Sequence, residues 1–192
     1  MTTKKTVYYM RHFEALHNIP PYNYNIPDPE LSPRGRTQAT AAIEMIKKIS
    51  SIDLIVCSPL TRALQTYLLV FNNQHRIPLI IHPDLQEVCT EPCDIGRSIS
   101  QLMLKFPNLF DELSTMEKTF GNNEWLDKIN PENIYSPKQI KQRTKRFLHW
   151  LNNRSEQHIF VISHNLMLKE LIHDDKHQKF NLQNGEIRTV EY

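Results

Sequence analysis

The sequence predicts an α/β fold in which a mostly parallel β-sheet lies between two layers of helices. Short apolar runs rich in Val, Ile and Tyr alternate along the chain with segments whose apolar residues recur at helical spacing. Strands separated by helices pair in parallel, and such a sheet must be covered on both faces. A chain of 192 residues can bury the core of one such domain, so we expect residues 1–192 to form a single domain.

Four buried strands and one edge strand are expected. Each buried strand is a short apolar run that suits a pleated sheet covered on both faces. The buried strands are residues 6–10, 53–57, 79–81 and 159–162. The stretch from Gly185 to Val190 is expected to add a strand at an edge of the sheet.

Ser-Pro pairs mark several expected helix starts, because serine is a favourable N-cap and proline fits the first turn. Ser32-Pro33 is followed by apolar residues at helical spacing as far as Ile49, and Ser136-Pro137 opens a helix with one apolar face. Other helices are expected at residues 61–71, 98–105 and 166–172. In the helix that starts at Ser136 we expect the basic residues to face mostly outward; they are Lys138, Lys141, Arg143, Lys145 and Arg146.

One part of the chain has no clean periodicity. Between Phe106 and Pro131 neither the helical nor the strand spacing is sustained. We interpret this part as an insertion that packs over the functional site. The predicted lid covers about residues 97–135.

Composition narrows the classes of function. The net charge is +2 and the basic residues are spread along the chain, which disfavours nucleic acid as a partner. No run approaches the ~20 apolar residues of a membrane span, and no signal peptide is visible, so no membrane partner is predicted. Three cysteines make a disulfide framework unexpected, and the cytoplasm or the nucleus is the expected compartment. Cys89, Cys93 and His82 lack the spacing of a metal site, so no metal is predicted, and no feature indicates an oligomeric state.

Polar side chains follow three of the predicted strands. Arg11 and His12 end the first strand, Arg62 comes shortly after the second, and His164 follows the fourth. Because the carboxyl ends of parallel strands lie at one edge of a sheet, we expect these side chains to converge. Two arginines and two histidines form an anion site, since a guanidinium group offers a planar pair of donors to phosphate oxygens.

Two further residues complete the predicted site. Asn18 offers a neutral amide donor in the loop after the first strand. Glu87, just after the third strand, is the candidate for handling a proton, because a carboxylate beside an anion site has no other electrostatic reason to be there.

The order and spacing of four motifs resemble those of the histidine phosphatase superfamily, which has the phosphoglycerate mutase-like fold. The motifs are Arg11-His12 with Glu14 and Asn18; Leu31-Ser32, Gly35 and Gln38-Ala39; Ser58-Pro59, Arg62-Ala63 and Gln65-Thr66; and Ser163-His164. They span most of the chain. The chain is most similar to the phosphoglycerate mutase-like branch of plants and fungi, in Leu16-His17-Asn18, in Pro92-Cys93-Asp94 with Arg97-Ser98-Ile99-Ser100, and in residues 147–151.

The resemblance implies a phosphatase mechanism that needs no metal ion or other cofactor. His12 would attack phosphorus and form a phosphohistidine, which divides one difficult transfer into two easier ones. Arg11, Arg62 and His164 would stabilise charge on the phosphoryl oxygens, with Asn18 as a further donor. Glu87 would protonate the leaving alcohol and then take a proton from water. Arg97 is a candidate for binding the far end of the substrate, with a solvated surface arginine as the equal alternative.

The sequence departs from the family pattern at two places. Phe13 occupies the position after the nucleophile, where glycine is usual; phenylalanine would be strained at a positive φ, or it would narrow the pocket and favour small substrates. The segment between Val88 and Pro92 is shorter than in the plant and fungal branch. The proton donor is therefore Glu87 or Glu91, and Glu87 is favoured because it lies nearer the strand.

The interpretation with the most support is a cytoplasmic phosphomonoester hydrolase that acts on a small phosphorylated metabolite. Phosphoglycerate mutase-type transfer is an alternative in which the phosphoenzyme resists water. A second alternative is a catalytically silent module that binds phosphate or a phosphopeptide. Sugar phosphates, phosphoglycerates, nucleotides and phosphoproteins remain open as substrates.

Overall fold

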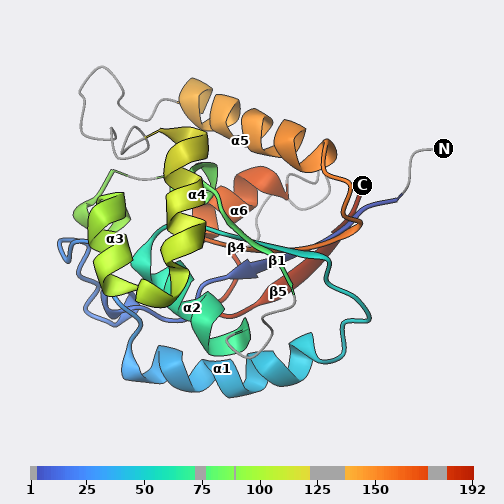
Figure 1. Cartoon of the computed structure of the whole chain (residues 1–192). Coiled ribbons are helices and arrows are strands. Elements are labelled where there is room, and N and C mark those ends of the chain that lie inside the picture. The colour runs from blue at the N-terminus through green and yellow to red at the C-terminus, as the bar shows by residue number, and fades with distance from the viewer. Residues whose placement is uncertain (1–3, 72–76, 89, 122–136, 173–180) are drawn as a thin grey trace.

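The computed structural model describes residues 4–71, 77–88, 90–121, 137–172 and 181–192 (Figure 1). Its centre is a five-stranded sheet with the strand order β3-β2-β4-β1-β5. The strands are β1 (Thr6–Arg11), β2 (Leu54–Cys57), β3 (Leu79–Ile81), β4 (His158–Ser163) and β5 (Ile187–Glu191). Pairing is parallel among the first four, and β5 joins the edge of β1 antiparallel. The structure confirms the mostly parallel sheet and the added edge strand.

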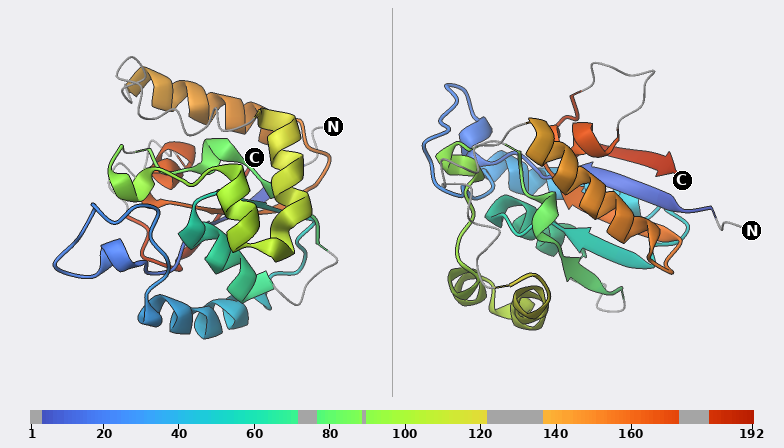
Figure 2. Two further views of the ribbon diagram at one scale, coloured as in Figure 1. Left: turned by 60° about the vertical axis from the view of Figure 1, so that its left-hand side comes forward. Right: turned by 90° about the horizontal axis from the view of Figure 1, so that it is seen from above.

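Side chains of the strands alternate between two cores, one on each face of the sheet. In β1, Val7 and Tyr9 enter one core, whereas Met10 enters the other. The helices α1 (Pro33–Ile46), α2 (Thr61–Phe71), α3 (Ile99–Lys105) and α4 (Phe110–Phe120) contribute to the core of Met10. The helices α5 (Pro137–Asn152) and α6 (Asn165–Leu171) contribute to the core of Val7. Figure 2 shows α1 and α5 on opposite sides of the sheet, so the three-layer prediction is confirmed. Among the described helices, none is long and apolar enough to cross a membrane.

Local capping explains where the helices begin. Ser32 Oγ accepts a hydrogen bond from the Gly35 N–H at 2.9 Å, and Pro33 lies in the first turn of α1, as predicted. Before α3, the Ser98 side chain caps the backbone N–H of Gln101. Ser136 lies outside the described residues. The start of α2 is capped from a distant loop instead.

That distant cap is the carboxylate of Asp28. Its Oδ1 accepts from the Thr61 N–H at 2.9 Å and its Oδ2 from the Thr61 hydroxyl at 2.5 Å. Asp28 is buried and has a φ of 38°, a backbone conformation that aspartate tolerates better than most residues. The loop between β1 and α1 is thereby attached to the helix that carries Arg62.

The described part of the predicted lid contributes to the core. Residues 97–121 include α4, a helix that the sequence pattern does not predict, whose buried Leu113 and Met116 join the core around Met10. Between Phe106 and Phe110 the chain makes a short 3₁₀ turn, which interrupts the helical spacing and hides α4 from a search for periodicity. Residues 122–135 lie outside the described residues, so the lid stays a prediction.

Candidate active site

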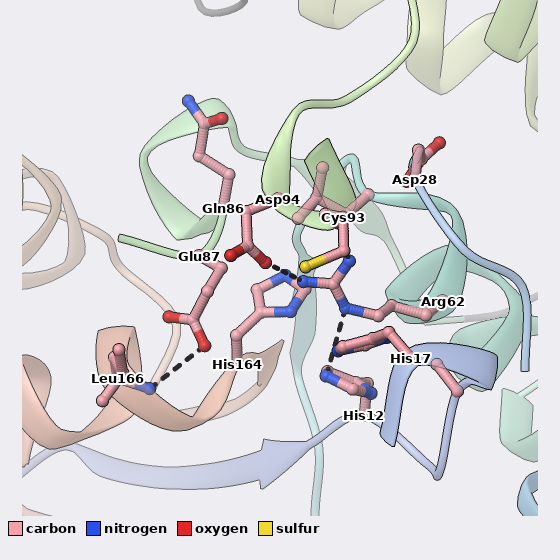
Figure 3. A network of polar contacts seen from close by, with 12 residues as sticks. His12, His17, Asp28, Arg62, Gln86, Glu87, Cys93, Asp94, His164 and Leu166 are labelled. Carbon is pink, nitrogen blue, oxygen red and sulfur yellow. Dashed lines mark hydrogen bonds and ion pairs between the residues drawn. The ribbon is translucent and has the colours of Figure 1, made fainter. Parts of the chain in front are cut away.

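The carboxyl ends of the parallel strands bring the predicted polar residues to one edge of the sheet. Arg11 pairs in register with Ser163, and Cys57 pairs with Ile162. His12 and His164 therefore follow their strands at the same level, and Ser58 lies one residue before that level. Figure 3 shows His12, Arg62 and His164 gathered in one network, with Glu87 beyond His164.

His12 is held as a neutral ring. It is 2% exposed, and its Nδ1 lies 2.6 Å from the carbonyl oxygen of Phe13. Because a carbonyl only accepts, Nδ1 carries the proton and Nε2 is an acceptor. Burial, followed by the charges of Arg62 and Arg11, holds the pKa of His12 well below its usual value. The ring thus presents an unprotonated Nε2 to the site.

Arg62 links three parts of the site. Its Nε donates to His12 Nε2 at 3.2 Å, its Nη1 to the Cys93 carbonyl at 2.6 Å, and its Nη2 to Asp94 Oδ1 at 2.8 Å. The side chain is 1% exposed, so these contacts satisfy a buried charge. Sequence reasoning did not assign Asp94 a role; its only signal was the Pro92-Cys93-Asp94 similarity to the plant and fungal branch.

His164 lies beside His12, with their ring centroids 5.0 Å apart. Its Nε2 is 2.7 Å from the hydroxyl of Ser58, which also accepts from the Leu60 N–H at 3.3 Å. The Ser58-Pro59 pair after β2 therefore places the second histidine as well as leading into α2.

The carboxylate of Glu87 lies at the N-terminus of α6. Its Oε1 accepts from the backbone N–H groups of Val88 and Met167, both at 3.0 Å, and its Oε2 from that of Leu166 at 3.2 Å. Glu87 is buried, whereas the alternative Glu91 is exposed. The structure thus places Glu87, and not Glu91, in the network of Figure 3.

Arg143 supports the Glu87 segment from α5. Its Nη2 donates to the Gln86 carbonyl at 2.7 Å and its Nη1 reaches the Glu87 carbonyl at 3.5 Å. Arg143 is 5% exposed, so the expectation that this arginine faces outward is wrong. Arg143 comes three residues after Ile140 and four before Phe147, so helical spacing places it on the buried face of α5. The carbonyls of Gln86 and Glu87 accept its hydrogen bonds there.

Arg11 and Asn18 border the network. Arg11 donates through Nη1 to the Leu182 carbonyl at 2.7 Å, and its buried Nε has no hydrogen-bond partner among the residues that the structure describes. Asn18 Oδ1 accepts from the Ala15 N–H at 3.2 Å, and its Nδ2 lies 3.0 Å from Nε2 of His17. Asn18 therefore holds the loop and the neighbouring His17 ring together.

Arg97 lies away from the histidines, beside Asp28. Its Nε is 3.2 Å from Asp28 Oδ2. Both residues line a cavity of about 350 Å³, whose other lining residues are Pro27, Pro92, Ile95, Gly96 and Gln101. The structure brings Arg97 to this cavity and not into contact with His12 or Arg62.

The sequence matches the model of a known protein family. Residues 7–192 match the model of the histidine phosphatase superfamily, branch 1. The chain belongs to the histidine phosphatase superfamily. It is 27% identical to phosphoglycerate mutase-like protein 1 of Arabidopsis thaliana over 83% of this chain and 68% of that protein.

Solved structures show that this histidine phosphatase superfamily member has the fold of its family. Phosphoglycerate mutase from Bacillus anthracis superposes with a TM-score of 0.68 at 17% identity, over 100% of this chain and 89% of that one. The α-ribazole phosphatase of Shigella flexneri superposes with a TM-score of 0.63 at 23% identity, over 96% and 89%.

Within this superfamily member, the unusual Phe13 is accommodated by the core. Among the described residues other than glycine, only Asp28 has a positive φ, so Phe13 is not strained in that way. Its ring is fully buried in the core around Met10 and lies against Gly185, where an added Cβ would come within 3.0 Å of Phe13 Cδ1. Gly185, which has no side chain, leaves the space that the Phe13 ring occupies.

Proposed function

We propose that this chain is a phosphomonoester hydrolase that acts through a phosphohistidine on His12, with side-chain cations in the place of a metal ion. The proposal depends on the state of the His12 ring. Its lowered pKa and the hydrogen bond from Nδ1 to the Phe13 carbonyl leave Nε2 unprotonated at neutral pH. A neutral imidazole is the form that attacks phosphorus, and the hydrogen bond from Arg62 Nε to Nε2 must break as the phosphoryl group arrives.

In the first step, the Nε2–phosphorus bond forms as the phosphorus–oxygen ester bond breaks. The transferring group carries negative charge on its non-bridging oxygens, and in this mechanism Arg11, Arg62 and His164 stabilise that charge. Arg62 donates to Nε2 in the free protein, so its guanidinium already lies where the phosphoryl group arrives.

Proton transfer is assigned to Glu87. It gives a proton to the leaving alkoxide in the first step and takes one from water in the second, when water attacks phosphorus and the Nε2–phosphorus bond breaks. Inorganic phosphate and the original state of His12 result. The three backbone N–H groups that hold the Glu87 carboxylate fix its position for both steps.

The first experiment measures phosphate release from p-nitrophenyl phosphate and from a panel of sugar phosphates, phosphoglycerates, nucleotides and phosphopeptides, with EDTA present. We expect turnover by the wild type and none by His12→Ala. The matched control is His149→Ala, since His149 is exposed on α5. An acid-labile phosphoenzyme should be trapped with the wild type and with the control only.

The second experiment tests the proton donor through the leaving group. Glu87→Gln should slow hydrolysis of alkyl phosphates by about 10²–10⁴-fold, the usual contribution of a general acid. The loss should be much smaller for p-nitrophenyl phosphate, because p-nitrophenolate leaves without protonation. Glu91→Gln is the control and should match the wild type on both substrates.

Two outcomes would replace the proposal. Phosphoenzyme that is stable in water but transfers its group to a phosphoglycerate would favour the mutase alternative. Phosphate binding by a folded wild type that forms no phosphoenzyme with any member of the panel would favour the silent binding module.

A further inference from the structure

His17 is a buried imidazole next to the proposed nucleophile to which neither the family resemblance nor the proposed mechanism gives a role. It is 5% exposed, and its ring centroid lies 6.1 Å from that of His12. Figure 3 shows the ring extending from the loop after β1 toward His12 and the guanidinium of Arg62.

The hydrogen bond to Asn18 fixes the protonation of the His17 ring. Nε2 lies 3.0 Å from Asn18 Nδ2, which only donates, so Nε2 is the acceptor and the proton resides on Nδ1. A flip of the Asn18 amide group would lose the hydrogen bond that its Oδ1 accepts from the Ala15 N–H. Burial and the charges of Arg62 and Arg11 lower the pKa of His17 to about 3, so the ring stays neutral.

The protonated Nδ1 lacks a partner. It is buried and has no hydrogen-bond partner among the residues that the structure describes. An N–H group in this situation is uncommon, because burial removes water that would otherwise bond to it, and in native proteins it usually marks a ligand or a bound water. The anion site that contains His12, Arg62 and Arg11 lies directly beside this ring.

We propose that His17 binds the phosphoryl group, donating a hydrogen bond from neutral Nδ1–H to a non-bridging oxygen. The inference rests on the proposed function only in placing the phosphoryl group at His12. A neutral donor suits this position because Arg62 and Arg11 already supply positive charge, and a further cation there would be repelled. Asn18 acts through His17 by holding its tautomer.

Two variants separate binding of the phosphoryl group from a structural role. In His17→Asn the amide nitrogen replaces Nδ1 but the acceptor for Asn18 is lost, whereas His17→Gln keeps an acceptor near Nε2 and loses the donor at Nδ1. We expect His17→Gln to lower kcat/KM about 10- to 100-fold, as for loss of one donor to a phosphoryl oxygen, and His17→Asn to restore most of it. The opposite order of the two variants would overturn the proposal, because it would mean that His17 only holds Asn18.

The pH profile gives a further readout. A neutral donor keeps its charge state between pH 5 and pH 8, so the loss in His17→Gln should be the same fold-change across that range. A loss that fades as the pH rises would show a cationic His17 and contradict the inference.

Binding of inorganic phosphate tests the inference without turnover. In protein labelled with ¹⁵N at the histidine rings, we expect His17 to have the Nδ1–H tautomer and its Nδ1 signal to shift on titration with phosphate. His17→Gln should weaken phosphate binding about tenfold, and His149→Gln should not. If phosphate shifts the His12 signals and leaves those of His17 unchanged, the inference fails. If His17 responds to phosphate but the protein forms no phosphoenzyme, the hydrolase proposal fails and the inference holds.

Discussion

Replacing Asp94 with alanine tests how strongly the site depends on one buried ion pair. Asp94 Oδ1 and Arg62 Nη2 lie 2.8 Å apart, and the two side chains are 8% and 1% exposed. Removing one partner of a buried pair costs about 3–5 kcal/mol, because the remaining charge stays desolvated. Arg62 keeps its contacts to Cys93 and His12, so we expect a loss of about 3 kcal/mol, near the lower end of that range.

Urea unfolding and thermal melting measure this loss. For a chain of this size, about 3 kcal/mol corresponds to a drop in Tm of about 6–12 °C. Asp94→Asn keeps an acceptor for Arg62 and should lose less. The control is Glu44→Ala, which removes an exposed ion pair with Lys47 and should leave the midpoint unchanged. If Asp94→Ala unfolds at the same urea concentration as Glu44→Ala, the reasoning is refuted.

Three further predictions concern pH, packing and the support of Glu87. Burial lowers the pKa of His82 to about 4, so between about pH 6.5 and pH 4 the unfolded chain binds more protons than the folded protein does. The wild type should therefore lose about 3 kcal/mol of stability from this group as the pH falls through that window. His82→Leu should flatten the pH dependence of the urea midpoint, and an unchanged slope would contradict this assignment. Gly185→Ala should destabilise the folded protein by about 1–3 kcal/mol, because φ is 81° and the Phe13 ring lies 3.0 Å from the added Cβ. Thermal melting measures this loss, and an unchanged Tm would contradict the prediction. Arg143→Met should slow hydrolysis of alkyl phosphates by about 10- to 100-fold while p-nitrophenyl phosphate is affected less, because the Glu87 segment loses its support; equal losses on both substrates would argue for a general folding defect.

Much of the fold could be predicted because its signals are local. The apolar runs give the strands, the sheet brings their carboxyl ends to one edge, and Arg11, His12 and His164 follow directly. Ser32-Pro33 gives the start of α1 because the cap lies within the same turn.

The features that sequence reasoning missed depend on contacts between distant segments. The carbonyls to which Arg143 donates lie more than fifty residues away in the sequence, and the pairing of Asp94 with Arg62 spans 32 residues. The accommodation of Phe13 depends on Gly185, at the other end of the chain. No local pattern encodes any of these contacts, because each partner looks ordinary in its own segment.

The contacts of Arg62 also determine how the site can receive a substrate. A guanidinium group has five N–H groups, and within the described part of the chain His12, Cys93 and Asp94 accept from three of them, which leaves two for incoming oxygens. Cys93 and Asp94 fix the plane of the guanidinium before any ligand arrives, so the direction of its remaining donors is preorganised, and the hydrogen bond to His12 Nε2 is the one that breaks in the reaction. A lysine would preserve the charge but not this plane, so shape as well as charge makes arginine the residue that this position requires.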